Sequence, residues 1–170
     1  MRTQLPAKEW ALTGAKGRSK HIITSLELNP ENLEAHNLVL QEKFAKMKAA
    51  EERWEEYKCD DAELVVVAYG TSARIARAAV DGARNLGLKV GLYRPVTVWP
   101  FPAAGLRRLA EKGVTQFLAV EMSSGQMVED VQLAVLGRAK VSLYGRMGGM
   151  VPTPREVLAE IQKALGGESK

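Results

Sequence analysis

Side chains able to do chemistry gather in four loops, each of which follows a strand-like run of apolar residues. The first loop, Gly70-Thr71-Ser72-Ala73-Arg74, combines a glycine turn, two hydroxyls and a guanidinium at the expected start of a helix. The free N–H groups of a helix N-terminus, together with a nearby cation, suit an anion. The loop lacks the lysine and spacing of a P-loop and the G-x-G-x-x-G pattern of a dinucleotide site. An anion site is therefore one interpretation, and a simple N-cap is the other.

The second loop runs from Arg94 to Pro102 and contains three prolines. Proline fixes φ and removes a backbone donor, so neither a helix nor a central strand can pass through this segment. It therefore forms a stiff, extended connector that carries Arg94, Thr97, Trp99 and Phe101. One interpretation is a rigid crossover whose aromatic side chains fill the edge of a core, and the other is a contact surface.

The third and fourth loops contain polar side chains with simpler explanations. Glu121 and Gln126 lie in Glu121–Met127, and Arg146 lies in Gly145–Met150 beside two methionines. Glu121 is a candidate ion-pair partner for Arg94, since the two end neighbouring elements. The fourth loop could be a tight turn, although flexible methionines suit contact with a partner.

No catalytic or metal-binding constellation is evident in the sequence. His21 and His36 are isolated, and Cys59 has no neighbouring histidine, so we expect this cysteine to be unreactive at a helix–strand junction. We predict no catalytic residue and no metal ligand in this chain. The loop residues are predicted to be interface or ligand-edge groups: Gly70, Thr71, Ser72, Arg74, Arg94, Thr97, Trp99, Phe101, Glu121, Gln126 and Arg146.

Composition excludes several classes of function. The net charge of +4 arises from residues 1–20, whereas the remaining residues carry 19 basic and 19 acidic side chains. Such balance argues against a nucleic-acid partner. No apolar run is long enough to span a membrane, and because the first residues lack the apolar h-region of a signal peptide, we expect no such peptide. One cysteine excludes a disulfide framework and a four-cysteine iron–sulfur site, so we expect a cytoplasmic protein.

The elements that position these loops alternate along the chain. We expect residues 1–58 to form an extended strap, with a short strand as an option at 21–26, and a long helix over 30–57. Asn29 and Pro30 suit the start of that helix, and Leu33, Leu40, Met47 and Trp54 repeat every seven residues, with Phe44 in the same stripe. From residue 59 onward, strands and helices alternate. The predicted strands are 64–69, 89–93, 116–121 and 141–144, and the predicted helices are 72–86, 102–112, 126–136 and 154–165.

This alternation predicts a three-layer α/β/α domain over 59–170 with a mainly parallel sheet. The continuous apolar run Leu64–Tyr69 fits a strand buried on both faces. Ile75, Ala79, Gly82 and Leu86 are predicted to face inward. Ligands and partners of such sheets collect at the carboxyl ends of the strands, where the four loops begin.

Several motifs, in order, resemble the C-terminal half of the α subunit of 2-oxoacid:ferredoxin oxidoreductases, a module similar to the transketolase C-terminal domain. The motifs are Asp61–Arg74, Val90–Pro102, Val120–Met122 with Gly125–Val131, and Tyr144–Gly149. Glu9–Arg18 and Leu33–Tyr57 resemble the branched-chain (2-oxoisovalerate) members most closely. The chain departs from the family at Ser123 and Ser124, since asparagine usually follows the Glu-Met pair. The resemblance also implies about five strands, with one antiparallel edge strand from the leader or the first α/β unit.

The resemblance implies a reaction in which thiamine diphosphate decarboxylates a 2-oxoacid, iron–sulfur clusters pass electrons to ferredoxin, and an acyl-CoA forms. We expect this chain to bind none of these cofactors, nor Mg²⁺, alone, because it lacks the family's thiamine domain, its diphosphate-and-metal motif and its cluster cysteines. Its expected partners are the thiamine-domain part of the α subunit, β and γ/δ-type subunits, and ferredoxin through the complex. The chain would be inactive by itself and would help to assemble the subunits.

Two alternatives remain from the residues alone. One is a free-standing anion- or nucleotide-binding module that uses Gly70, Thr71, Ser72 and Arg74. The other is a non-enzymatic domain that oligomerises through the Leu33–Trp54 stripe.

Overall fold

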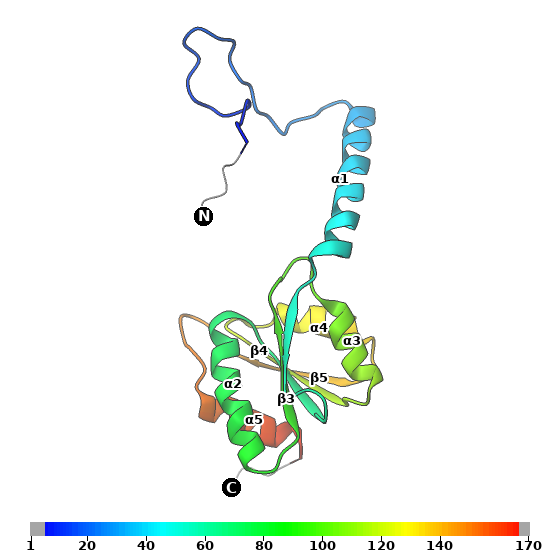
Figure 1. Ribbon diagram of the computed structural model, residues 1–170, viewed down its shortest axis with the longest axis vertical. Coiled ribbons are helices and arrows are strands. Elements are labelled where there is room, and N and C mark those ends of the chain that lie inside the picture. Colours follow the sequence, from blue (N-terminus) through cyan, green and yellow to red (C-terminus); the bar gives the residue numbers. More distant parts are fainter. Residues whose placement is uncertain (1–5, 167–170) are drawn as a thin grey trace. The chain divides into compact units, whose positions relative to one another are not determined.

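The computed structural model describes residues 6–166 and divides the chain into two compact units, Met1–Lys43 and Phe44–Lys170 (Figure 1). In the first unit, residues 6–29 contain turns but no helix or strand, so the optional strand at 21–26 does not form. The division falls earlier than the boundary expected between residues 58 and 59. The reason is that residues just after the first helix join the sheet of the second unit.

The first helix, α1, spans Pro30–Glu51 and crosses the division between the units. Asn29 caps it as predicted, since its side-chain oxygen accepts a hydrogen bond of 2.8 Å from the N–H of Asn32. The expected end at residue 57 was wrong. No residue of α1 is buried, and Trp54 lies outside the helix, so the apolar stripe is shorter than the sequence suggested.

Residues Trp54–Tyr57 form β1, an edge strand antiparallel to β3 (Val90–Pro95), with Trp54 opposite Pro95 and Tyr57 opposite Leu92. Trp54 and Tyr57 are three residues apart, a spacing that fits a turn of helix. In a strand this spacing puts them on opposite faces, where Trp54 packs on the core under α3 and α4, and Tyr57 packs on the core under α2 and α5. Backbone pairing with β3 decides between the two. The antiparallel edge strand was predicted, but its origin in the leader or the first α/β unit was wrong.

The sheet has the order β1-β3-β2-β4-β5, in which β2 (Leu64–Val67), β3, β4 (Gln116–Glu121) and β5 (Lys140–Gly145) are parallel. Five strands, four of them parallel, confirm the predicted sheet. Helices α2 (Gly70–Asn85) and α5 (Pro154–Ala164) pack on one face. Helices α3 (Ala103–Glu111) and α4 (Met127–Val135) pack on the other (Figure 1).

Strand β2 lies at the centre and supplies both cores. Val65 and Val67 pack toward α3 and α4, whereas Leu64 and Val66 pack toward α2 and α5, and all four are fully buried. Because successive side chains of a strand point to opposite faces, a strand covered on both sides must be apolar throughout. The run of apolar residues in the sequence is explained by this position.

The inward face of α2 was only partly predicted. Ala79 is buried and Ile75 packs against the core, but Leu86 is 59% exposed because the helix ends at Asn85. The predicted capping box at the start of α5 is confirmed: the Thr153 side chain accepts from the Glu156 N–H, and the Glu156 carboxylate accepts from the Thr153 N–H.

Candidate functional site

The four segments that follow β2, β3, β4 and β5 leave the same edge of the sheet, because these strands are parallel. The first predicted loop, Gly70–Arg74, is the beginning of α2, so residues 68–69 alone connect β2 to that helix. We call residues 68–69, 96–102, 122–126 and 146–153 the carboxyl edge. Tyr69, Val98 and Gln126 from three of these segments, together with Asp130 of α4, line a hollow of about 250 Å³. The pKa of Asp130 is raised by partial burial and by the neighbouring Glu129 and Glu121.

Two residues of the proline connector are held by structural contacts. The Thr97 hydroxyl accepts a hydrogen bond of 3.1 Å from the N–H of Arg53, and the Thr97 N–H donates to the Arg53 carbonyl at 3.2 Å. Phe101 packs against the core under α3 and α4. The Tyr93 hydroxyl donates to the Pro102 carbonyl, which fixes the end of the connector. Thr97 and Phe101 therefore stabilise the fold.

Trp99 lies at the outer side of the connector. Its ring meets that of Phe44 edge-to-face, with centroids 5.5 Å apart, yet the residue remains 51% exposed. Half-exposed tryptophan is a common feature of surfaces that bind other proteins.

Glu121 is buried and serves as the cap of α4. Its carboxylate accepts from the Ser123 hydroxyl at 2.7 Å and from the N–H groups of Gln126, Met127 and Val128 at 3.0, 3.1 and 3.1 Å. A negative charge at a helix N-terminus is favourable, and four donors compensate its burial. The expected ion pair between Glu121 and Arg94 was wrong, because this carboxylate is already satisfied.

Ser123 and Gln126 have roles that the sequence did not reveal. Ser123 is one of the two serines at which this chain departs from the pattern of the family that it resembles. Its hydroxyl donates to the Glu121 carboxylate and accepts from the Gly125 N–H at 3.2 Å. Gln126 contributes its backbone to this cap, while the residue itself is exposed.

Arg146 holds the fourth loop to α5. Its guanidinium pairs with the Glu156 carboxylate at 2.8 Å. The pKa of Glu156 is lowered, chiefly by the Thr153 backbone and hydroxyl and then by Arg146. Arg146 thus acts within the chain, whereas Met147 and Met150 of the same loop are exposed.

The carboxyl edge exposes apolar side chains from every one of its four loops. The side chains of Thr97, Glu121 and Arg146 bond to groups of this chain, and Phe101 packs on the core. Other residues therefore form the exposed surface of this edge. This exposed apolar set consists of Tyr69, Val96, Val98, Trp99, Met122, Met147, Met150 and Val151.

The remaining predicted residues divide between a pocket and the core. Gly70, Thr71, Arg74 and Arg94 line a pocket of about 530 Å³ between β1, β3 and the first half of α2. Ser72 is buried and does not line it. Arg94 forms an ion pair of 3.2 Å with Glu55 of β1.

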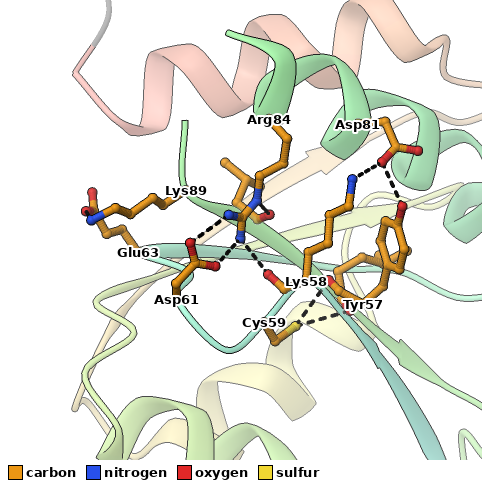
Figure 2. Close-up of polar contacts among 10 residues, drawn as sticks. Tyr57, Lys58, Cys59, Asp61, Glu63, Asp81, Arg84 and Lys89 are labelled. Carbon is orange, nitrogen blue, oxygen red and sulfur yellow. Dashed lines mark hydrogen bonds and ion pairs between the residues drawn. The ribbon is translucent and has the colours of Figure 1, made fainter. Parts of the chain in front are cut away.

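A polar cluster that the sequence did not reveal lies at the opposite edge of the sheet (Figure 2). Here, before β2 and β3 begin, the Arg84 guanidinium binds the Asp61 carboxylate through two nitrogens at 2.9 and 2.7 Å. It also donates to the carbonyls of Lys58 and Val90, both at 2.7 Å. We call this cluster, with Tyr57, Cys59 and Asp81, the amino-edge clamp.

The second part of the clamp centres on Asp81. Its carboxylate accepts from the Lys58 ammonium at 2.6 Å and from the Tyr57 hydroxyl at 2.8 Å (Figure 2). These donors lower the pKa of Asp81, and Arg84 lowers that of Asp61. The basic residues near the end of α2 were the only signal of this cluster in the sequence.

Cys59 of the clamp is buried and lies in the connection from β1 to β2. Its thiol donates weakly to the carbonyl of Leu92 at 3.3 Å, and burial raises its pKa to about 11. A thiol with so little thiolate at neutral pH is a poor nucleophile, which agrees with the predicted inertness. Its expected position at a helix–strand junction was wrong, because β1 precedes it.

Over residues 6–166, no group of three or more histidine, cysteine, aspartate or glutamate side chains is arranged to hold a metal ion. In that same stretch, no helix combines the length and apolar character needed to cross a membrane.

Comparisons with known proteins give a consistent result. Residues 62–157 match the family described as pyruvate:ferredoxin oxidoreductase core domain II. Over 96% of its length, the chain is 48% identical to the ketoisovalerate oxidoreductase subunit VorB of Methanothermobacter marburgensis, of which it covers 46%. It is 39% identical over 102 residues to the 2-oxoglutarate synthase subunit KorA of the same organism, a match that covers 60% of this chain and 27% of that subunit.

The chain thus spans about half the length of the ketoisovalerate oxidoreductase subunits that it matches. Among solved structures, the 2-oxoglutarate:ferredoxin oxidoreductase of Magnetococcus marinus gives a TM-score of 0.66 at 18% identity, covering 88% of this chain and 27% of that one. A split-gene transketolase, described as an inactive beta4 tetramer, gives 0.57 at 18% identity, covering 67% and 41%. At this identity the two structures show a shared fold, which confirms the three-layer α/β prediction.

Proposed function

Because this chain belongs to the 2-oxoacid:ferredoxin oxidoreductase family, whose core domain II it contains, we propose that it is the subunit-assembly part of such an oxidoreductase. It corresponds to the C-terminal half of an α subunit. The complex oxidatively decarboxylates a 2-oxoacid to an acyl-CoA and reduces ferredoxin. Identity of 48% to a ketoisovalerate oxidoreductase subunit supports a branched-chain substrate.

One observation carries the assembly role: all four loops of the carboxyl edge expose apolar side chains at the edge where α/β sheets meet ligands and partners. Among the polar side chains of the same loops, Thr97, Ser123 and Arg146 bond to groups within the chain. The occupant we propose is the part of an α subunit that this chain does not match, since the relatives are about twice as long. Trp99 and Val98 would be central to that contact.

The other predicted residues fit supporting roles. Thr97, Phe101, Glu121, Gln126 and Arg146 would hold the loops in shape, so that the exposed side chains meet a partner without rearrangement. Residues 1–58, with the strap and α1, would act as a docking segment for other subunits. The further partners we propose are β and γ/δ-type subunits, and ferredoxin through the complex.

The cofactors implied by the family do not fit this chain's own residues. An iron–sulfur cluster takes about four thiolates, whereas the chain has one cysteine, and Cys59 is buried with its thiol directed at carbonyl oxygens. We therefore place thiamine diphosphate, Mg²⁺, the clusters and coenzyme A on other parts of the complex. The low cysteine content supports a cytoplasmic setting.

Co-purification tests the contact. The chain would be co-expressed with the segment of the M. marburgensis subunit that it does not match, carrying an affinity tag. Val98→Glu combined with Trp99→Glu should reduce recovery of the complex about tenfold or more, because a charge would be buried in an apolar contact. Leu133→Glu is the matched control: Leu133 is 69% exposed on α4, away from the carboxyl edge, and its replacement should leave recovery unchanged.

Equal recovery of all variants would remove the carboxyl edge as the contact. Thiamine diphosphate binding by this chain alone that depends on Mg²⁺ and is much tighter than pyrophosphate binding, both measured by calorimetry, would contradict the proposal that the cofactor is held elsewhere.

A further inference from the structure

The largest hollow described above is the pocket of about 530 Å³ between the edge strands and α2. Its walls are formed by Glu55 and Tyr57 of β1, Leu92 and Arg94 of β3, and residues from Gly70 to Arg77 of α2. It is separate from the exposed apolar set and shares no residue with the 250 Å³ hollow. A pocket of this size accommodates a small molecule.

Three guanidinium groups converge on this pocket. Arg74 and Arg77 lie three residues apart on α2, so they lie on the same side of the helix, and Arg94 reaches the pocket from β3. Glu55 pairs with Arg94. The carboxylate of Glu56 is engaged elsewhere, since it accepts from the Trp54 indole at 2.7 Å and pairs with Arg108 of α3. Positive charge is therefore in excess at the pocket wall.

The donors of these arginines are incompletely used. The Nε of Arg94 is buried and has no hydrogen-bond partner among the described residues. Arg77 lies over the Tyr57 ring, 4.3 Å from its centroid, which orients the guanidinium without using its N–H groups. Arg74 has no acceptor in the part of the chain that the structure covers. By contrast, Arg84 on the same helix has four hydrogen bonds to protein groups.

The N-terminus of α2 adds to this positive field. Tyr69, at the N-cap position, provides no side-chain acceptor for the first N–H groups of the helix. Gly70 has a φ of +57°, and a Cβ atom at this residue would meet nothing within 4 Å, so the backbone stands open at the pocket. Free N–H groups and the helix dipole favour an anion at this point.

We propose that this pocket binds the phosphate group of a small organic phosphate. Arg74 and Arg94 hold the phosphate oxygens, the N–H groups of Gly70 and Thr71 complete the site, and Arg77 is positioned by Tyr57. Guanidinium groups are well matched to phosphate because their planar N–H pairs reach two oxygens at once.

Calorimetry on the full 170-residue chain tests this, with pyrophosphate and ADP as probes. Pyrophosphate should bind saturably, and Arg74→Ala should weaken it about tenfold, as expected for loss of a charge-assisted contact. Arg94→Gln should weaken it similarly. Arg107→Ala, which removes an exposed guanidinium from α3 on the other face of the sheet, should leave binding unchanged.

Thermal unfolding of each variant shows whether it is folded. Should Arg94→Gln fail to fold, Arg74→Ala decides the matter, because Arg74 is exposed on α2. The absence of saturable binding up to about 10 mM, or an equal loss in Arg107→Ala, would overturn the proposal. Binding of a polyglutamate peptide without binding of pyrophosphate would also overturn it. The Val98→Glu, Trp99→Glu variant should still bind pyrophosphate, so the pocket and the assembly surface can fail separately.

Discussion

The two edges of the sheet differ in whether their side chains find partners within the chain. At the amino edge, Arg84 binds Asp61 and two backbone carbonyls, Asp81 accepts from Lys58 and Tyr57, and the nearby thiol is buried. At the carboxyl edge, apolar side chains from four loops are exposed, and in the pocket beside α2, Arg94 of β3 keeps a donor without an acceptor among the described residues. In this α/β fold, the polar groups of the amino edge are thus bonded within the chain, whereas the apolar side chains of the carboxyl edge remain exposed.

This difference separates polar residues that serve the fold from those available to a partner. A buried or half-buried polar group costs free energy unless it is hydrogen-bonded, so groups satisfied within the chain are explained by stability alone. Arg84 and Arg74 lie on the same helix, yet only Arg84 is explained in this way. Residues without such an explanation are the better candidates for function.

The largest expected effect comes from Glu121, the buried carboxylate at the end of β4. Glu121→Ala would leave three backbone N–H groups of α4 and the Ser123 hydroxyl without their acceptor. We expect the free energy of unfolding to fall by about 3 kcal/mol, since buried unsatisfied donors and a lost cap add together. Urea denaturation followed by circular dichroism measures this.

Glu129→Ala is the matched control, because Glu129 lies exposed in the first turn of the same helix. It should cost about 0.5 kcal/mol through the helix dipole alone. A similar loss in both variants would mean that Glu121 acts only as a charge near the helix and that its hydrogen bonds contribute little.

The second effect compares two arginines of one helix. Arg84→Ala should lower the free energy of unfolding by about 2 kcal/mol, because it removes two carbonyl contacts and a bidentate pair. Arg74→Ala should change it by less than about 0.5 kcal/mol, as is usual for an exposed side chain without partners. Chemical denaturation of both variants gives the two values. Equal destabilisation would break the distinction between the edges.

The sequence predicted the central strands better than the edge strand. Strong apolar patterns, such as Leu64–Val67 and Gln116–Glu121, fixed the central strands to within a few residues. The segment Trp54–Tyr57 was assigned to the preceding helix, because its apolar spacing fits either structure. Only pairing with β3, far along the chain, decides that it is a strand.

Candidate residues could be identified because they follow predicted strands, but their roles could not be predicted. Glu121 was expected to meet Arg94, whereas it caps the helix that follows it, a local contact whose geometry depends on the turn at Ser123. The clamp around Arg84 unites groups from three separate segments, and no spacing rule in the sequence connects them. Gly70, Thr71, Arg74 and Arg94, which line the pocket, were among the candidate residues, but the wall that β1 forms was not predicted, because residues 54–57 were assigned to a helix.

The smallest effect is a change in acid sensitivity at the amino edge. Arg84 lowers the pKa of Asp61 from its ordinary value of 3.8, and Lys58 with Tyr57 lowers that of Asp81. A carboxylate whose pKa is lower in the folded state stabilises that state above its unfolded pKa. This contribution is lost as the pH falls through the folded pKa.

The difference in stability between the wild-type chain and Arg84→Ala should therefore be constant above about pH 5 and shrink below about pH 4. Since Asp81 keeps its own donors in that variant, the remaining acid sensitivity of Arg84→Ala should fall further in Arg84→Ala, Asp81→Asn. Melting temperatures measured from pH 7 down to about pH 3 at fixed salt follow both steps. A difference that stays constant into acid would show that Arg84 stabilises the chain through its bonds to the Lys58 and Val90 carbonyls and not through Asp61. The amino edge would then be closed by backbone contacts, and the charges around it would be incidental.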